Sequence, residues 1–390
     1  MTETVVHGLP RWSLAVPPLA LVVLVLSWGR DLGALLLILV CAGLGAAVIA
    51  AVHHAEVVAH RVGEPFGTLI LALAVTIIEV ALIVTLMASG GDKAASLARD
   101  TVFAAVMITC NGILGLALVV GSLRHKTQAF RVHASGSALA VMTALVTLSL
   151  VVPTFTTSTP GATFSSAQLA FAGVTSLVMY GVFVFVQTIR HRDYFLPIPT
   201  AETPAAMTAV SAAGGKATGE ADEDVEDDGV GVVHAAAPSS RVALTSLALL
   251  FVCLIAVVGL AKTVSPKLES AVESAGAPLA VVGVVIALLV LLPETVAAVR
   301  AALRDRLQTT LNLTLGSALA SIGLTIPAIA IASIWLDGPL VLGLSGKDMV
   351  LFALTVVVSM LTLATGRATL LQGAVHLMIF GSFLFLTVSP

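Results

Sequence analysis

Apolar residues along this chain form long runs that are separated by short polar segments. A helix needs roughly twenty apolar residues to cross the hydrocarbon core of a bilayer. Runs of about that length occur at approximately residues 13–29, 33–52, 66–89, 100–121, 135–153, 167–188, 241–262, 278–299, 308–334, 348–364 and 369–388. The pattern therefore predicts an all-α polytopic membrane protein with about 11 transmembrane helices.

The composition agrees with this prediction. The chain has 390 residues, of which 58% are hydrophobic and 11% charged, whereas soluble domains average about 25% charged residues. The three cysteines lie scattered inside apolar runs, so we interpret them as small packing residues. We expect the lipid bilayer, inorganic cations and protons as partners. We expect no nucleic acid and no resident cofactor, and the sequence leaves the oligomeric state open.

The basic residues between the runs indicate an orientation. With 11 spans, 13 Lys and Arg residues fall on the side of the N-terminus and 6 on the other side. Cytoplasmic loops carry an excess of Lys and Arg. We therefore expect a multi-pass membrane protein with a cytoplasmic N-terminus and an external C-terminus.

One segment, residues 190–240, differs from the rest. It carries seven carboxylates between Glu220 and Asp228, set among Ala, Thr, Gly and Pro. Such a segment has too little apolar surface to fold, which favours a solvated cytoplasmic linker, or alternatively an electrostatic collector of cations. It divides the chain into an N-terminal tail with an extra helix (1–32), a first half (33–189) and a second half (241–390).

Each half contains one carboxylate deep in an apolar run. Glu79 lies within "LILALAVTIIEVALIVTLM" and Glu294 within "VVGVVIALLVLLPETVAAV". An ionised carboxylate at the bilayer centre is costly, and such residues are usually functional. No Lys or Arg lies at matching depth in any run, which argues against an acid held by an ion pair.

The two acidic helices have opposite directions. Glu79 lies in a helix that we expect to run outward, and Glu294 in one that we expect to run inward. Each is followed by a helix rich in small and polar residues. Two similar elements of opposite direction form an inverted repeat, the usual design of secondary transporters, with the site at the membrane midplane. We therefore predict two inverted five-helix repeats, with site motifs at 63–121 and 283–327.

Several oxygen atoms near these acids are candidate cation ligands. Pro293 has no N–H, which leaves the carbonyl of Leu289 without its helical partner. Carboxylate, hydroxyl, amide and carbonyl oxygens suit a hard cation such as Ca²⁺ or Na⁺. The candidate cation and proton site comprises Glu79, Glu294, Thr76, Asn111, Ser317, Gly316 and Pro293, with Glu79 and Glu294 as the metal ligands.

A histidine cluster at the end of the second run is a separate candidate. His53, Glu56 and His60 fall on one helical face, at a spacing that resembles metal ligands. The alternatives are a role in cation access or pH sensing and ordinary polarity at the membrane surface. An intramembrane metal-dependent enzyme built on this cluster is a further alternative, although the chain lacks a nucleophile motif. We expect a transporter and not an enzyme.

Two stretches resemble a known family. Residues 63–80 (GEPFGTLILALAVTIIEV) and 292–327 (LPETVAAVRAALRDRLQTTLNLTLGSALASIGLTIP) resemble the two α-repeats of the calcium:cation antiporter superfamily, and most of all its ChaA-type bacterial calcium/sodium/potassium–proton antiporters. The resemblance runs from about residue 33 to the end of the chain.

The resemblance implies a ten-helix core in two inverted halves, often with an extra N-terminal helix and an acidic connecting stretch. It also implies that Glu79 and Glu294 bind the cation and carry protons. Many members have G-N-x-x-E-H at these acids, whereas Thr76 replaces the asparagine here and Val80 and Thr295 replace the histidine. These departures do not support a histidine-based proton gate.

Together these features predict a secondary antiporter that exports Ca²⁺ in exchange for H⁺, with Na⁺ and K⁺ as further candidate substrates. Burial and proximity both disfavour two charged carboxylates, so cation and protons compete for Glu79 and Glu294. The alternative is a Na⁺-coupled Ca²⁺ exchanger, which would usually need more oxygen ligands than two deep acids provide.

Overall fold

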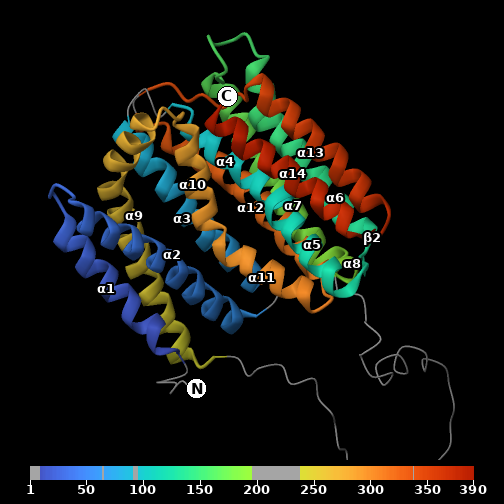
Figure 1. Cartoon of the computed structure of the whole chain (residues 1–390), viewed down its shortest axis with the longest axis horizontal. Helices are drawn as coiled ribbons and strands as arrows, with labels where there is room; N and C mark the ends of the chain where they lie inside the picture. The colour runs from blue at the N-terminus through green and yellow to red at the C-terminus, as the bar shows by residue number, and fades with distance from the viewer. Residues whose placement is uncertain (1–8, 64–65, 91–94, 196–237, 337) are drawn as a thin grey trace, which may run out of the picture.

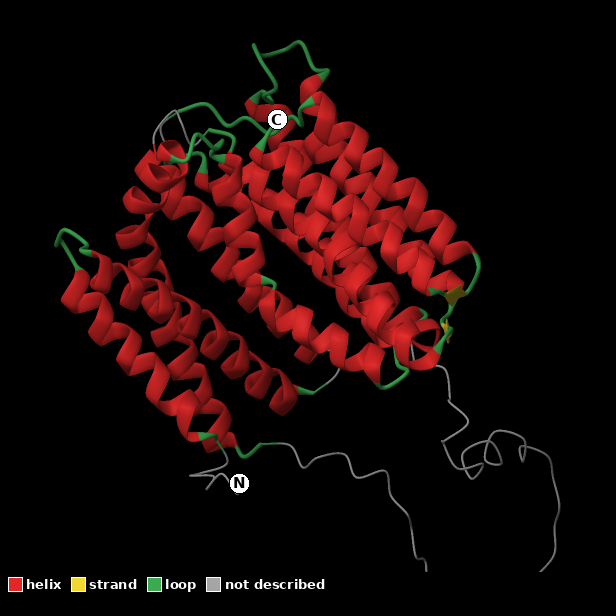
Figure 2. Cartoon of the chain, viewed as in Figure 1, coloured by secondary structure: helices red, strands yellow, loops and turns green. Residues whose placement is uncertain are grey.

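The computed structural model describes residues 9–63, 66–90, 95–195, 238–336 and 338–390, and these fold into a bundle of long helices (Figure 1; Figure 2). The acidic run Glu220–Asp228 lies outside the described residues. The elements of the first half are α1 (Arg11–Ser27), α2 (Ala34–Val62), α3 (Phe66–Gly90), α4 (Leu97–Met107), the π-helix η2 (Ile108–Ile113), α5 (Leu114–His125), β1 (Gln128–Ala129), α6 (Val132–Val146), the π-helix η3 (Thr147–Val151), the 3-10 helix η4 (Val152–Thr154), α7 (Ser166–Phe185), the π-helix η5 (Val186–Arg190) and α8 (Arg192–Phe195).

The second half has fewer interruptions. Its elements are α9 (Ser240–Ser274), α10 (Ala280–Val290), α11 (Leu292–Leu303), α12 (Leu307–Ala332), α13 (Gly346–Ala364), β2 (Arg367–Ala368) and α14 (Leu370–Val388). Serine side chains define several helix starts: Ser165, Ser239 and Ser345 each accept a hydrogen bond from the first turn of α7, α9 and α13.

Eight helices in the described part of the chain are long and apolar enough to cross a membrane. The pair α10 and α11 passes the same test together, which gives up to nine spans, and α1 and residues Ala72–Ala88 are shorter apolar helices. The prediction of a polytopic all-helical membrane protein is therefore confirmed in its coarse form. The count of 11 spans and the repeat arrangement stay predictions.

The buried apolar residues form two clusters. One lies mainly within α4, α5, α6, α7, α12, α13 and α14, and the other within α1, α2, α3, α9 and α10. Figure 1 shows α1, α2 and α9 side by side at one edge of the bundle, with α3, α10 and α11 between them and the remaining helices. Both α3, which carries Glu79, and α10, which precedes the Glu294 helix α11, contribute residues to both clusters and so lie along the seam between them.

The larger cluster is tied together at both ends by contacts between the two halves. At one end β1 pairs with β2, and the Gln128 amide donates to the Ala302 carbonyl at 2.8 Å. At the other end the Leu344 amide donates to the Leu150 carbonyl at 2.7 Å, and the Thr154 hydroxyl donates to the Leu344 carbonyl at 2.9 Å. The two halves therefore share one packed unit.

The break between α10 and α11 is the clearest departure from a straight helix. The two axes differ by 54°, and Leu291 joins them with φ −87° and ψ 2°. Pro293 occupies the first turn of α11, where its missing N–H is tolerated, so the break has a local sequence cause. The run predicted at 278–299 is thus two helices rather than one.

Candidate cation site

Glu79 lies in the middle of α3 and is only 4% exposed. The Ser321 hydroxyl of α12 lies 2.6 Å from one oxygen of Glu79 and 2.7 Å from the other, and donates to the carboxylate. Such short contacts are typical of hydrogen bonds to an ionised acceptor. An acid from the first half is therefore held directly by a serine from the second half.

Thr325 lies one turn further along α12 and adds a second hydroxyl. Its side chain is fully buried and interacts electrostatically with Glu79. The hydroxyl nevertheless has no hydrogen-bond partner among the described residues. A buried hydroxyl without a partner is costly, and a bound cation would give its oxygen a ligand role.

Glu294 lies in the first turn of α11, directly after the break. Helix N-termini carry partial positive charge, which favours a carboxylate there. The residue is half-buried, and its Oε2 atom is buried without a hydrogen-bond partner in the described part of the chain. Glu56 and Glu79 are the charged groups that act on it, and both are acidic. The Oε2 atom of Glu294 is therefore available to bind a cation or a proton.

Neither deep acid has a basic partner. In the described residues the ion pairs between side chains are Arg99–Asp100 and Lys347–Asp348, and neither includes Glu79 or Glu294. The alternative of a structural acid neutralised by Arg or Lys therefore has no support in the described structure.

The other predicted ligands have different surroundings. Thr76 is 4% exposed and lies one turn before Glu79, without a hydrogen bond to any described residue. Ser317 is half-buried one turn before Ser321 on α12 and likewise makes no such bond. A side chain at Gly316 would meet no atom within 4 Å, so there is open space beside this part of α12.

Asn111 is tied to helices of the second half. It is fully buried within η2, and its Nδ2 donates to the Thr355 hydroxyl of α13 at 2.9 Å. Its Oδ1 lies 3.1 Å from Nδ1 of His376 on α14. The predicted ligand is thus engaged by two side chains that the sequence did not single out.

The histidine cluster lies where α1 packs on α2. The His53 ring lies 5.0 Å from the Trp12 ring between centroids, and the buried His54 donates from Nε2 to the Ser13 carbonyl at 2.9 Å. Glu56 and His60 are exposed. Among the described residues no group of three His, Cys, Asp or Glu side chains could hold a metal ion. The packing therefore favours a contact between helices over a resident metal.

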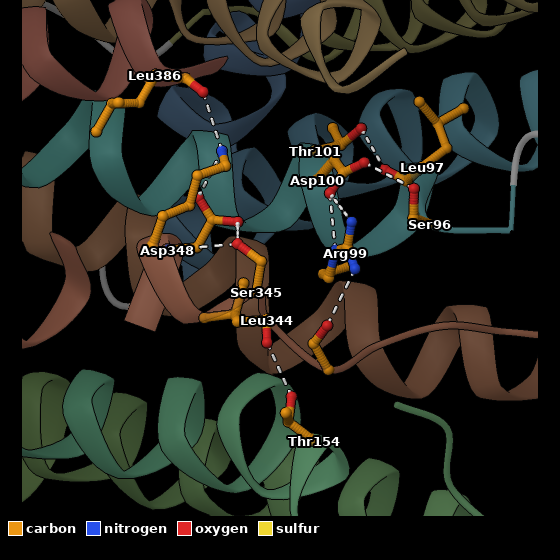
Figure 3. A network of polar contacts seen from close by, with 12 residues as sticks. Ser96, Leu97, Arg99, Asp100, Thr101, Thr154, Leu344, Ser345, Asp348 and Leu386 are labelled. Atoms are coloured by element: carbon orange, nitrogen blue, oxygen red, sulfur yellow. Dashed lines mark hydrogen bonds and ion pairs between the residues drawn. The ribbon is translucent and has the colours of Figure 1, made fainter. Parts of the chain in front are cut away.

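A second polar network joins the halves where α4 and α13 begin (Figure 3). Asp100 accepts hydrogen bonds from Ser96 at 2.8 Å and from Arg99 Nε at 2.8 Å. Arg99 also donates to the Gly343 carbonyl at 3.0 Å. Asp348 accepts from Ser345 at 2.6 Å. These acids are satisfied by neighbouring donors, unlike Glu294.

Comparison with known proteins gives a family and a fold. The sodium/calcium exchanger protein family matches residues 32–189 and 245–389. The chain is 47% identical over 384 residues to y4hA of Sinorhizobium fredii, whose name describes an ionic transporter, covering 98% of this chain and 97% of that protein. It is 35% identical over 376 residues to the sodium-potassium/proton antiporter ChaA of Escherichia coli, covering 95% and 94%.

Two solved structures share the fold. Native YfkE matches with a TM-score of 0.68 at 15% identity, over 97% of this chain and 99% of that chain. The H⁺/Ca²⁺ exchanger CAX matches with a TM-score of 0.63 at 14% identity, over 96% and 87%. The overall helix arrangement is therefore that of solved cation exchangers.

Proposed function

The chain belongs to the sodium/calcium exchanger protein family, within the ChaA-type branch of the calcium:cation antiporters, and on that premise we propose that it exports Ca²⁺ from the cytoplasm in exchange for H⁺. The ions named for its relative ChaA make Na⁺ and K⁺ further candidate substrates. Cation and protons compete for Glu79 and Glu294. The protein is an antiporter of a transmembrane family and acts as a secondary transporter.

One observation carries the proposal: the carboxylates of Glu79 on α3 and Glu294 on α11, from different halves, have no basic partner among the described residues. Two such groups cannot both stay ionised without compensation in a low-dielectric site. A bound cation or bound protons provide that compensation, and each excludes the other. If the empty, charged site does not reorient, the cation and the protons are exchanged.

The donor set fits a hard cation as substrate. The Ser321 hydroxyl is at Glu79, the Thr325 hydroxyl is buried nearby, and Glu294 Oε2 is unpartnered among the described residues. Pro293 leaves the Leu289 carbonyl without its helical donor close to Glu294. We include Thr76, Gly316 and Ser317 in the cation path because they lie on the same two helices, α3 and α12. Oxygen ligands of this kind bind Ca²⁺ or Na⁺ rather than soft metals.

The proposal includes an arrangement in the membrane. We infer two inverted five-helix repeats after one extra N-terminal helix, spanning the bacterial inner membrane 11 times. The N-terminus and the 190–240 linker are cytoplasmic and the C-terminus is external. Support comes from the basic residues, which favour one side, and from the two termini, which lie at opposite ends of the bundle (Figure 1).

Everted membrane vesicles test the exchange. Vesicles containing the protein are energised by respiration, and the proton gradient is followed with a pH-sensitive dye. Adding CaCl₂ is expected to dissipate the gradient, and parallel additions of NaCl and KCl identify further substrates. Vesicles without the protein are the control. If no cation dissipates the gradient but an imposed Na⁺ gradient drives Ca²⁺ movement, the protein is a Na⁺-coupled exchanger. If neither occurs, the proposal is wrong.

A further inference from the structure

A chain of buried hydrogen bonds connects η2 to the last two helices. The Thr362 hydroxyl lies 3.1 Å from His376 Nε2, His376 Nδ1 lies 3.1 Å from Asn111 Oδ1, and Asn111 Nδ2 donates to Thr355 at 2.9 Å. Thr355 in turn donates to the Leu351 carbonyl at 2.8 Å. All four polar side chains of this chain are at most 3% exposed.

The donors and acceptors in this chain follow from its chemistry. An amide oxygen can only accept, so His376 carries a proton on Nδ1 and donates it to Asn111. A neutral imidazole then has a free lone pair on Nε2, which accepts from the Thr362 hydroxyl. His376 and Thr355 thus hold the two ends of the Asn111 amide, with its oxygen toward α14 and its nitrogen toward α13.

Close backbone packing brings these groups together. A Cβ atom on Gly115 would lie 2.9 Å from His376 Cβ and 3.0 Å from the Leu377 nitrogen. One on Gly373 would lie 2.7 Å from the Val119 nitrogen. Only glycine fits these two positions, so α5 and α14 touch backbone to backbone at the level where His376 reaches Asn111.

Asn111 occupies the same place in its helix as Ser321 does in the other half. Asn111 is 14 residues after Leu97, where α4 begins, and Ser321 is 14 residues after Leu307, where α12 begins. Ser321 binds the first deep acid. The segment η2 packs against α11, which carries the second deep acid, Glu294. In addition, π-helical segments occur frequently at functional sites.

From these observations we propose that His376 is a positioning residue: by holding Asn111, it fixes η2 as the part of the first half that completes the cation site around Glu294. The inference rests on the proposed function, since it concerns the same site. His376 does not touch the cation. Its loss frees the Asn111 amide to rotate and loosens η2, which weakens cation binding without removing either acid.

Three substitutions of His376 separate its two hydrogen bonds. His376→Asn keeps a donor near the position of Nδ1 and so keeps the bond to Asn111. His376→Gln places its amide near the position of Nε2 and keeps only the Thr362 end, and His376→Leu removes both bonds. We expect the Ca²⁺ concentration for half-maximal proton movement to rise about tenfold for Gln and Leu, and less than about twofold for Asn, with maximal rates little changed.

Thr362→Val is the matched control, because it removes only the far bond of the chain; a change of less than about twofold is expected. Amide hydrogen exchange of Ile108–Ile113 in the purified protein gives a readout that does not depend on transport. It should be faster in the Gln and Leu variants than in wild type and Asn.

The proposal is overturned if Gln and Leu leave the half-maximal concentration unchanged, or if Asn is impaired as much as Leu in a folded protein. If the Leu variant does not fold, the comparison of Asn with Gln decides. A wild-type protein that moves no protons with any cation contradicts the proposed function instead, and hydrogen exchange alone then decides the role of His376.

Discussion

At the scale of single residues, a hydrogen bond from the Ser321 hydroxyl to the Glu79 carboxylate connects the second half of the chain to the first. The Ser321 hydroxyl oxygen lies 2.6 and 2.7 Å from the two carboxylate oxygens, in a site where Glu79 is 4% exposed. A buried carboxylate has few other donors available, so this bond both favours the charged form and limits the rotation of the acid. Through this bond, Ser321 of α12 keeps the Glu79 carboxylate charged and oriented, as the proposed cation binding requires.

Replacing Ser321 by alanine tests this role. Removing the hydroxyl that lies 2.6 and 2.7 Å from the carboxylate oxygens leaves a buried acceptor less satisfied, at a cost of about 1–3 kcal/mol. We expect a half-maximal Ca²⁺ concentration roughly ten times higher in the vesicle assay. Ser246→Ala is the matched control, because Ser246 is fully buried on α9 and its hydroxyl has no partner among the described residues. An equal effect of both substitutions would show that the bond to Glu79 is unimportant.

The two deep acids give the sharpest residue-scale prediction. Glu79→Gln and Glu294→Gln should each abolish exchange, because glutamine can neither hold a negative charge nor carry a proton. The melting temperature should stay the same or rise, because the cost of a buried charge is removed. Proton movement and melting are measured on the same preparations, with the exposed Glu273→Gln as control. Exchange at the wild-type rate in either variant would exclude that acid from the shared site.

The sequence predicts the acids of this site better than their neighbours. Glu79 and Glu294 are conspicuous because each is the ionisable residue of an apolar run. Ser317 and Ser321 lie one turn apart on the same face of α12. Which of the two contacts Glu79 depends on how far α12 is shifted along its axis relative to α3, and a single sequence does not contain this information. His376 gave no signal, because a single histidine in an apolar helix has no distinctive pattern.

At the scale of elements, the break before Glu294 combines a bend of 54° with a helix N-terminus at the acid. Both depend on Pro293, which cannot donate to the Leu289 carbonyl. In Pro293→Ala, that bond can form and α10 and α11 can join into one straighter helix. We expect a slower maximal rate of exchange, with a melting temperature equal to or above that of wild type.

Pro266→Ala is the control for this prediction, because Pro266 lies exposed inside α9, away from both acids. It should leave exchange unchanged. Wild-type exchange in Pro293→Ala would mean that the broken helix has no role in transport.

The polar network at the start of α4 and α13 contains two ion pairs that differ in length and in burial (Figure 3). Arg99 approaches Asp100 to 2.7 Å, with side-chain exposures of 17% and 10%, whereas Lys347 lies 3.4 Å from Asp348 and is 32% exposed. Removing one partner of a largely buried pair leaves an uncompensated charge, and an exposed pair contributes little.

Arg99→Gln should therefore lower the melting temperature clearly, since it also removes the hydrogen bond to the Gly343 carbonyl that joins the two halves. Lys347→Gln should lower it much less. Thermal unfolding of the purified variants decides between them, and an equal loss in both would show that the Arg99 contacts add no stability.

At this scale the sequence accounts for the helices but not for their irregularities. The apolar runs predict where helices lie, but the run at 278–299, predicted as one helix, is two, α10 and α11. The π-helical segments η2, η3 and η5 have no distinctive pattern in the sequence. The close crossing of α5 and α14 depends on Gly115 and Gly373, which become informative only once the two helices are known to touch.

At the scale of the whole molecule, the seam between the two apolar clusters places α3 and α10 where both clusters meet. The larger cluster is tied across its halves at both ends, by β1 and β2 at one end and by the contacts of Leu344 at the other. The unit formed by α1, α2 and α9 has a separate core. The proposed binding site therefore lies at the boundary between two packed units, where a relative movement would change access.

The orientation of this bundle in the membrane is the last prediction. The end that carries Arg124, Lys126, Arg300, Arg304 and Arg306 should face the cytoplasm, because positively charged loops are retained there. A reporter enzyme that is active only in the periplasm should therefore be active when fused after Pro390. The same reporter inserted in the 190–240 linker should be inactive, and a reporter that needs the cytoplasm should give the reverse result. If the C-terminal fusion is active only in the cytoplasm, the number of spans is even, and one of the 11 predicted spans is miscounted.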